Sequence, residues 1–166
     1  RRGSAYLLAR VQERKAAARP VTIDELIDDF AYLEDWEDRY RYVIELGKDL
    51  EPLADEDHSD ANKVKGCVSQ VWLRTDVSKG DDGTPVLHFT GDSDAHIVRG
   101  LIAIVLTLYS DRPAREIVAT GPDDTFSKIG LDEHLSPQRS NGLHAMVQRI
   151  QNDAASALSD AGLAPA

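Results

Sequence analysis

Two amphipathic helices are predicted in the first third of the chain. Thr22 and Glu25 have the spacing of a capping box, in which a hydroxyl and a carboxylate three residues apart bind free backbone N–H groups at a helix start. Four apolar residues follow at helical spacing: Ile23, Leu26, Ile27 and Phe30. A second helix is expected from about Asp35 to Pro52, with an apolar stripe of Trp36, Tyr40, Val43 and Ile44. Stripes at this spacing are usually core faces, so both helices should pack on the body of a domain.

The middle of the chain alternates between apolar and polar positions and predicts a β-hairpin. Residues 70–77 and 86–90 are rich in β-branched and aromatic side chains, and residues 78–83 between them are turn formers. The acidic stretch 51–60 shows little periodicity, so we expect an exposed loop that leads toward the hairpin.

The most apolar helix is predicted over residues 95–109, where apolar side chains cover a wide arc. A helix of this kind must be central to the core. Gly100 within it costs about 1 kcal/mol of helix propensity relative to alanine, which indicates that a neighbouring backbone approaches closely.

The last third of the chain is predicted to be helical. A short helix should begin at Asp111–Pro113 and end at Gly121–Pro122, and one or two further turns contain Phe126 and Ile129. A final amphipathic helix should run from about Ser140 to Leu158. Because the two strands are sequential and no helix separates them, we expect a small antiparallel sheet packed on one side by helices, an α+β fold.

Length and composition are typical of one globular domain in a reducing compartment. The chain has 166 residues, 42% of them hydrophobic, with one cysteine and a formal charge of −10. No apolar run approaches the roughly 18 residues of a membrane helix, and none forms a signal-peptide core of roughly 7 to 15 residues. Negative charge disfavours nucleic acid, whose phosphates need a basic surface, so the partner should be a protein. We expect a cytoplasmic protein without membrane association.

Positive charge is concentrated at the start of the chain. Residues 1–19 carry six basic side chains and one acidic side chain, a net charge of +5, so residues 20–166 carry −15. An Arg-rich and Ala-rich segment is compatible with an organelle transit peptide or a nucleic-acid-binding arm. A frayed or weakly helical extension is the simpler interpretation. We expect residues 1–21 to lie outside the core, residues 22–160 to form a single domain and residues 161–166 to be a tail.

Cys67 is the only cysteine and stands where a polar loop meets the first strand. A lone thiol cannot form an internal disulfide, and it cannot alone hold a structural zinc or a cluster bound by several thiolates. Packing and reactivity are the alternatives, and most buried thiols are inert. Gly66 frees the backbone beside the sulphur, while Lys63 and Lys65 bring positive charge that favours the thiolate. These features are typical of a loop tip and favour reactivity.

Motifs around this cysteine resemble those of SufE-type sulphur-acceptor proteins, in matching order and spacing from about Leu26 to Ile150. The matching motifs are Asn62, Gly66–Cys67, Ser69–Trp72, Gly91–Asp94, Gly100–Ala103, His134–Pro137, Arg139–Ser140 and Gly142–Leu143. Val68 departs from the family, which commonly has glutamine after the cysteine. The resemblance implies a fold similar to the scaffold on which iron–sulphur clusters are assembled.

The resemblance also implies a function. Cys67 would accept the terminal sulphur of a persulfide from a cysteine desulfurase of the Suf type, stimulate that enzyme and pass the sulphur to an iron–sulphur scaffold complex. Pyridoxal phosphate would belong to the desulfurase, and this chain would hold no cofactor and would not be a free-standing enzyme. Two alternatives are a regulatory protein that binds the desulfurase without covalent transfer, and a free-standing thiol enzyme, for which the sequence offers no evident base or pocket. Whether the protein forms a homodimer is open.

Five residues are expected to support Cys67. Arg139 matches the family's arginine, and its charge would favour a thiolate or persulfide anion, with an arginine that only fixes a helix start as the alternative. Asp94 would be the N-cap of the helix that follows it and would anchor a loop near the cysteine. The other three lie in the cysteine motif: Gly66, Ser69 and Gln70.

Cys67 is predicted to alternate between two states. A permanently exposed thiolate is open to oxidation, whereas a thiol buried among apolar groups has a raised pKa and cannot reach a partner. In the resting state the sulphur would be tucked inward, and Gly66 would be the pivot that turns the loop outward. The apolar pocket of the resting state would be roofed or lined by Val64, Val68, Val71 and Trp72.

Histidines offer two further candidates. None of the five is spaced for a metal site, which would need ligands from distant parts of the fold. His134 and His144 could in principle serve Cys67 as a base. Exchange with a persulfide needs only a thiolate, however, and the resemblance does not imply a cysteine–histidine pair.

Overall fold

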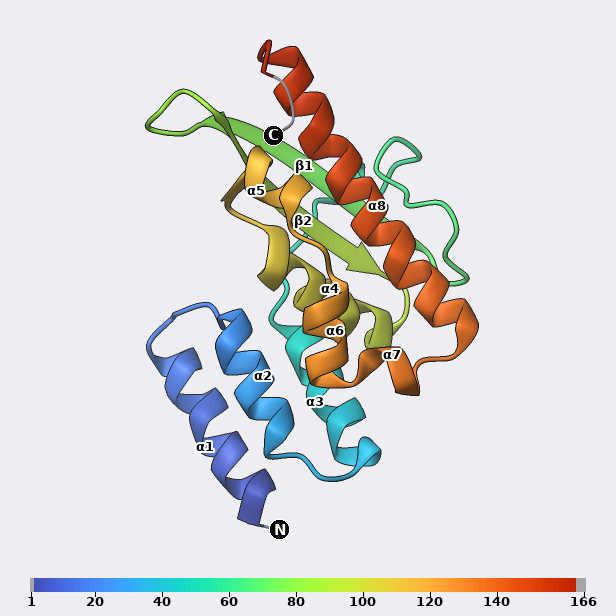
Figure 1. Cartoon of the computed structure of the whole chain (residues 1–166). Coiled ribbons are helices and arrows are strands. Elements are labelled where there is room, and N and C mark those ends of the chain that lie inside the picture. Colours follow the sequence, from blue (N-terminus) through green and yellow to red (C-terminus); the bar gives the residue numbers. More distant parts are fainter. Residues whose placement is uncertain (1, 164–166) are drawn as a thin grey trace.

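The computed structural model describes residues 2–163 and shows an α+β architecture, which confirms the predicted fold class (Figure 1). In chain order the elements are α1 (Arg2–Ala16), α2 (Ile23–Ala31), α3 (Trp36–Lys48), the 3-10 helix η1 (Asp55–Asp57), β1 (Val71–Lys79), β2 (Pro85–Ser93), α4 (His96–Tyr109), β3 (Arg112–Pro113), α5 (Ala114–Ala119), α6 (Asp123–Ile129), α7 (Leu131–His134) and α8 (Pro137–Asp160). The capping box expected at Thr22 is present and begins α2.

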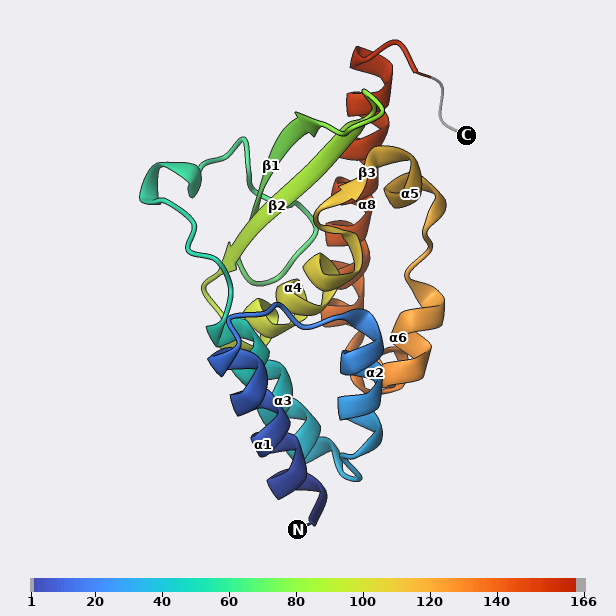
Figure 2. The ribbon, with the colours of Figure 1, turned by 90° about the vertical axis from the view of Figure 1, so that its left-hand side faces the viewer.

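The sheet is antiparallel, three-stranded and ordered β1-β2-β3. The predicted hairpin is confirmed: β1 pairs with β2 from Val71 opposite Ser93 to Lys79 opposite Pro85. α8 runs along the sheet, and α4 crosses below it, so the helices gather on one side (Figures 1 and 2). The apolar side chains of both strands that are buried in this core are Val71, Leu73, Leu87 and Phe89.

The third strand was not predicted. Arg112 and Pro113, expected at the start of a short helix, pair instead with Leu87 and Val86 of β2, and the helix begins at Ala114. A two-residue strand has too little pattern to be recognised before its partner strand is in place.

The close approach predicted at Gly100 is confirmed. A Cβ atom added there would lie 2.0 Å from the carbonyl oxygen of Val43, and one added at Gly47 would lie 2.6 Å from the backbone nitrogen of Gly100. The two glycines therefore let the backbones of α3 and α4 touch. α4 thus packs against α3 and also contacts β2 of the sheet.

The expectation that residues 1–21 stay outside the core is wrong for α1. Leu7 is 5% exposed and belongs to the core cluster, and α1 lies beside α2 and α3 (Figure 2). Arg14 donates to the fully buried carboxylate of Asp29 at 2.6 Å, and the hydroxyl of Tyr42 donates to the same oxygen. Residues 164–166 of the predicted tail lie outside the described residues.

Candidate functional site

Cys67 lies at the tip of a closed loop that precedes β1. The backbone N–H of Val64 donates to the carbonyl of Val71, and the N–H of Leu73 donates to the carbonyl of Asn62, each at 2.8 Å. These bonds extend the hairpin backward and close the base of the loop. Gly66 has φ +95°, a left-handed conformation that strains any other residue.

Asp94 anchors this loop, although not as predicted. The residue at the N-cap of α4 is Ala95, and no side chain in the described part of the chain caps that helix. The Asp94 Oδ1 atom instead accepts a hydrogen bond from the backbone N–H of Gln70 at 3.0 Å. The capping role is therefore wrong, and the contact between Asp94 and the cysteine loop is observed.

The thiol of Cys67 rests against the first turns of α8. Its Sγ atom donates to the carbonyl of Gly142 at 3.6 Å, and a Cβ atom added to Gly142 would lie 3.4 Å from Sγ. Burial raises the pKa of the Cys67 thiol, because a thiolate is poorly solvated there. The expectation that Lys63 and Lys65 favour the thiolate is therefore wrong for this state, in which desolvation dominates.

A cavity of about 100 Å³ adjoins the thiol. Arg139 lines it together with Cys67, and the Arg139 Nη1 atom is buried without a hydrogen-bond partner among the described residues. Ser69 also reaches the cavity. Its apolar walls come from the cysteine loop, β1, α4 and α8: Val68, Val71, Val98, Leu101, Leu143 and Met146. An inward thiol thus shares a small, largely apolar space with a buried cationic nitrogen.

The residues proposed to roof the pocket divide into two groups. Val68 and Val71 line the cavity, as predicted, whereas Val64 is buried but does not line it. Val68 is nevertheless 78% exposed, so most of its side chain faces solvent. Trp72 is half-buried and its indole contacts the His58 ring edge-on, with centroids 4.8 Å apart. The apolar cover of Cys67 therefore comes from α4 and α8 more than from its own loop.

The two candidate bases lie in other contacts. His134 stacks on Trp36 with ring centroids 3.9 Å apart, and His144 Nδ1 lies 2.7 Å from the carbonyl oxygen of Ser140. Within residues 2–163, no group of three or more histidine, cysteine, aspartate or glutamate side chains is arranged to hold a metal ion. In this same range no helix is long and apolar enough to cross a membrane.

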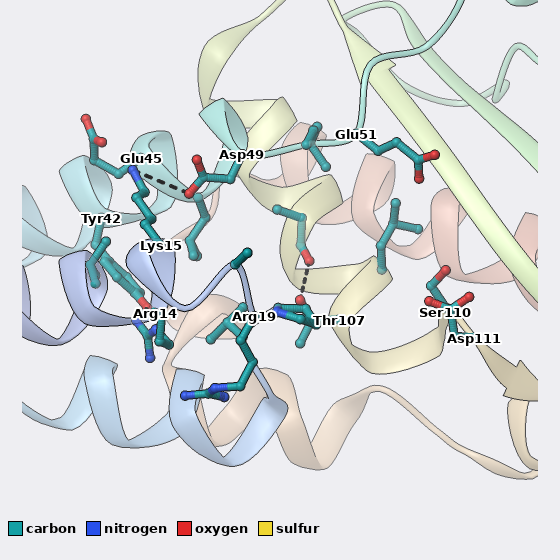
Figure 3. Close-up of a pocket in the computed structure, with 18 residues that line it drawn as sticks. Arg14, Lys15, Arg19, Tyr42, Glu45, Asp49, Glu51, Thr107, Ser110 and Asp111 are labelled. Atoms are coloured by element: carbon teal, nitrogen blue, oxygen red, sulfur yellow. Dashed lines mark hydrogen bonds and ion pairs between the residues drawn. The ribbon is translucent and has the colours of Figure 1, made fainter.

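A second cavity, of about 740 Å³, lies between α1, α3 and α4 (Figure 3). Leu46 and Leu106 are among the apolar residues that line it. Lys15 reaches across to Asp49, with 3.6 Å between Nζ and Oδ2. Cys67 does not line this cavity, and the only one of the two cavities that adjoins its thiol is the smaller one.

Sequence reasoning missed the partner of the thiol. Gly142 appeared in a matched motif, but its carbonyl, which receives the S–H group, is a backbone atom that no residue type reveals. Val98 and Leu101 were recognised as core residues of a central helix, not as walls of the cysteine cavity. No signal in the sequence places Val98 and Leu101 beside Cys67, which lies 31 and 34 positions earlier (98 − 67 and 101 − 67).

Comparisons with known proteins agree on one family. The model for the SufE Fe-S metabolism associated domain matches residues 24–154. An uncharacterized SufE-like protein of Rhizobium etli is 62% identical over 133 residues, which are 80% of this chain and 89% of the relative. A similarly named protein of Rhizobium meliloti is 56% identical over 133 residues, 80% of this chain and 94% of the relative.

A solved structure supports the same fold. The solution structure of a hypothetical protein from Thermus thermophilus is similar with a TM-score of 0.66 and 19% sequence identity. The likeness covers 84% of this chain and 98% of the other. At this identity it is evidence for the fold alone.

Proposed function

Because this chain belongs to the SufE family, which is associated with Fe–S metabolism, we propose that Cys67 accepts sulphur from a cysteine desulfurase. The desulfurase is a separate, pyridoxal-phosphate-dependent protein that this chain stimulates, and the sulphur then passes to an iron–sulphur assembly scaffold. One observation carries the proposal. The single thiol of the chain lies on a loop tip over a small cavity that also holds the buried, unpartnered Nη1 of Arg139.

The transfer is a thiol–persulfide exchange. The Cys67 thiolate attacks the terminal sulphur of the desulfurase persulfide, and a new S–S bond forms as the old one breaks. The bonding pair of the old bond leaves with the desulfurase cysteine as its thiolate. Cys67 then carries the terminal sulphur as a persulfide, with no net oxidation. The reaction needs a reduced thiol, which fits the cytoplasm.

Exchange requires that the loop open. In the resting state the Sγ atom contacts α8 and its burial raises the pKa of the thiol, both of which suppress attack. A desulfurase that binds the outward form more tightly shifts this balance by a factor of ten for each ~1.4 kcal/mol of differential affinity. Gly66, in its left-handed conformation, is the proposed pivot.

Arg139 and Val68 have distinct proposed roles. The permanent charge of Arg139 favours an anionic sulphur in the cavity, since its buried Nη1 has no other partner among residues 2–163. Val68 is 78% exposed beside the cysteine, and this exposure supports a proposed contact of its side chain with the desulfurase. Its apolar side chain replaces the amide common in the family, so this contact should be less polar here.

The test is intact mass after incubation with a desulfurase and cysteine. Covalent transfer adds the mass of one sulphur atom to the wild type and none to Cys67→Ser. The rival, a regulatory protein that acts by binding alone, predicts no added mass and full stimulation of the desulfurase by Cys67→Ser. No added mass on the wild type, together with full stimulation by Cys67→Ser, would refute sulphur transfer.

A further inference from the structure

Trp36, at the start of α3, holds the segment that precedes α8. Its indole stacks on the imidazole of His134, with centroids 3.9 Å apart and an interplanar angle of 22°. Tyr40, one turn later in α3, donates from its hydroxyl to the carbonyl of His134 at 2.9 Å. Gly130 also lies close to the ring, since a Cβ atom added there would lie 3.2 Å from the indole. Side chain and backbone of His134 are thus both held by α3.

The segment held in this way leads directly to the cysteine cavity. His134 ends α7, and Ser136 caps α8 by accepting from the backbone N–H of Arg139 at 3.3 Å. Arg139 in turn lines the cavity of Cys67. Trp36 and Tyr40 do not line that cavity, so any effect they have on its chemistry must pass through this turn.

We propose that Trp36 and Tyr40 are positioning residues for sulphur transfer. They fix the turn between α7 and α8 so that the guanidinium of Arg139 stays in the cavity of Cys67. The inference rests on the proposed sulphur-acceptor function and adds two residues of α3 to it. It also assigns His134 a role as a stacking platform, because its ring lies on Trp36 and makes no observed contact with the thiol.

The expected effect follows from the size of an aromatic contact. A stacked or tilted aromatic pair stabilises its arrangement by an amount that corresponds to a change of roughly twofold to tenfold in population. Trp36→Ala should therefore slow sulphur acceptance roughly twofold to tenfold at saturating desulfurase, and Trp36→Phe should restore most of the rate. Tyr40→Phe keeps its ring, loses only the hydrogen bond to His134 and should slow acceptance less.

The experiment measures the rate at which sulphur is added to the full chain, by intact mass, with a desulfurase and cysteine. Each substitution at Trp36 is made in the wild type and in Arg139→Gln. If the turn acts through Arg139, Trp36→Ala slows the wild type but has no further effect on Arg139→Gln, a non-additivity that general destabilisation does not produce. Equal slowing in both backgrounds, or none in the wild type, would overturn the inference.

Two further variants keep the test decisive. His134→Phe retains a flat ring and should accept sulphur at the wild-type rate, whereas His134→Ala should be slow. If both are equally slow, the imidazole itself is needed and the stacking role is wrong. If Trp36→Ala does not fold, Tyr40→Phe replaces it and is measured in the wild type and in Arg139→Gln, because Tyr40 is partly exposed. A wild type that takes up no sulphur refutes the proposed function, whereas normal uptake by every α3 variant refutes only this inference.

Discussion

Removing the carboxylate of Asp94 should expose Cys67. The Oδ1 atom of Asp94 accepts a hydrogen bond from the backbone N–H of Gln70, three residues after the thiol. A hydrogen bond to a charged acceptor contributes about 1.5–3 kcal/mol, but Asp94 is exposed, so solvent reduces its contribution to about 1 kcal/mol. Asp94→Ala should therefore raise the population of the open loop about fivefold.

Alkylation by a small thiol reagent measures this population. When the loop closes faster than the reagent reacts, the labelling rate is proportional to the open fraction and to the reagent concentration. Asp94→Ala should be labelled about fivefold faster than the wild type at an unchanged melting temperature. The cause is local, because the backbone N–H of Gln70 would lose the one side-chain acceptor that it has among residues 2–163 while the core is untouched.

Asp94→Asn is the matched control. Asparagine loses the charge near the start of α4 but keeps a carbonyl oxygen that can accept from Gln70. It should therefore be labelled at close to the wild-type rate. If Asn and Ala variants react equally fast, charge and not the hydrogen bond holds the loop. If neither differs from the wild type, Asp94 does not anchor the thiol and the reasoning fails.

Three further predictions concern charge and burial. Arg139→Gln should slow sulphur acceptance without a matching loss of melting temperature, and a change in melting temperature alone would make the arginine structural. Because burial raises the pKa of Cys67, its alkylation rate should rise with pH through an inflection above that of an ordinary cysteine; an inflection at the ordinary value would contradict the buried state. Arg14→Met should lower the free energy of unfolding by about 3 kcal/mol in urea, since the buried Asp29 loses its 2.6 Å ion pair and keeps the longer 3.7 Å contact with Arg10, whereas the exposed Arg19→Met should change little. If both substitutions lower the free energy of unfolding equally, the ion pair between Arg14 and Asp29 does not hold α1 in the fold.

Much of the secondary structure was determined by local pattern. The capping box at Thr22, the apolar arc of α4 and the alternation of β1 and β2 are rules that act within a few residues, so the sequence displays them directly. Gly100 likewise predicted a close contact, because a glycine inside a helix lowers helix propensity and the missing Cβ atom lets a neighbouring backbone approach. The motifs around the cysteine identified the family by the same kind of short-range signal.

Tertiary structure alone decided the state of the thiol and the extent of the core. Lysines beside Cys67 pointed to a thiolate, yet the walls supplied by α4 and α8 desolvate the sulphur and raise its pKa. The sequence of α1 predicted an extension because it is basic and weakly apolar, but in the structure Arg14 binds the fully buried carboxylate of Asp29 on α2. Desolvation and ion pairing depend on which atoms surround a group in space, and those atoms come from segments that no local pattern brings together.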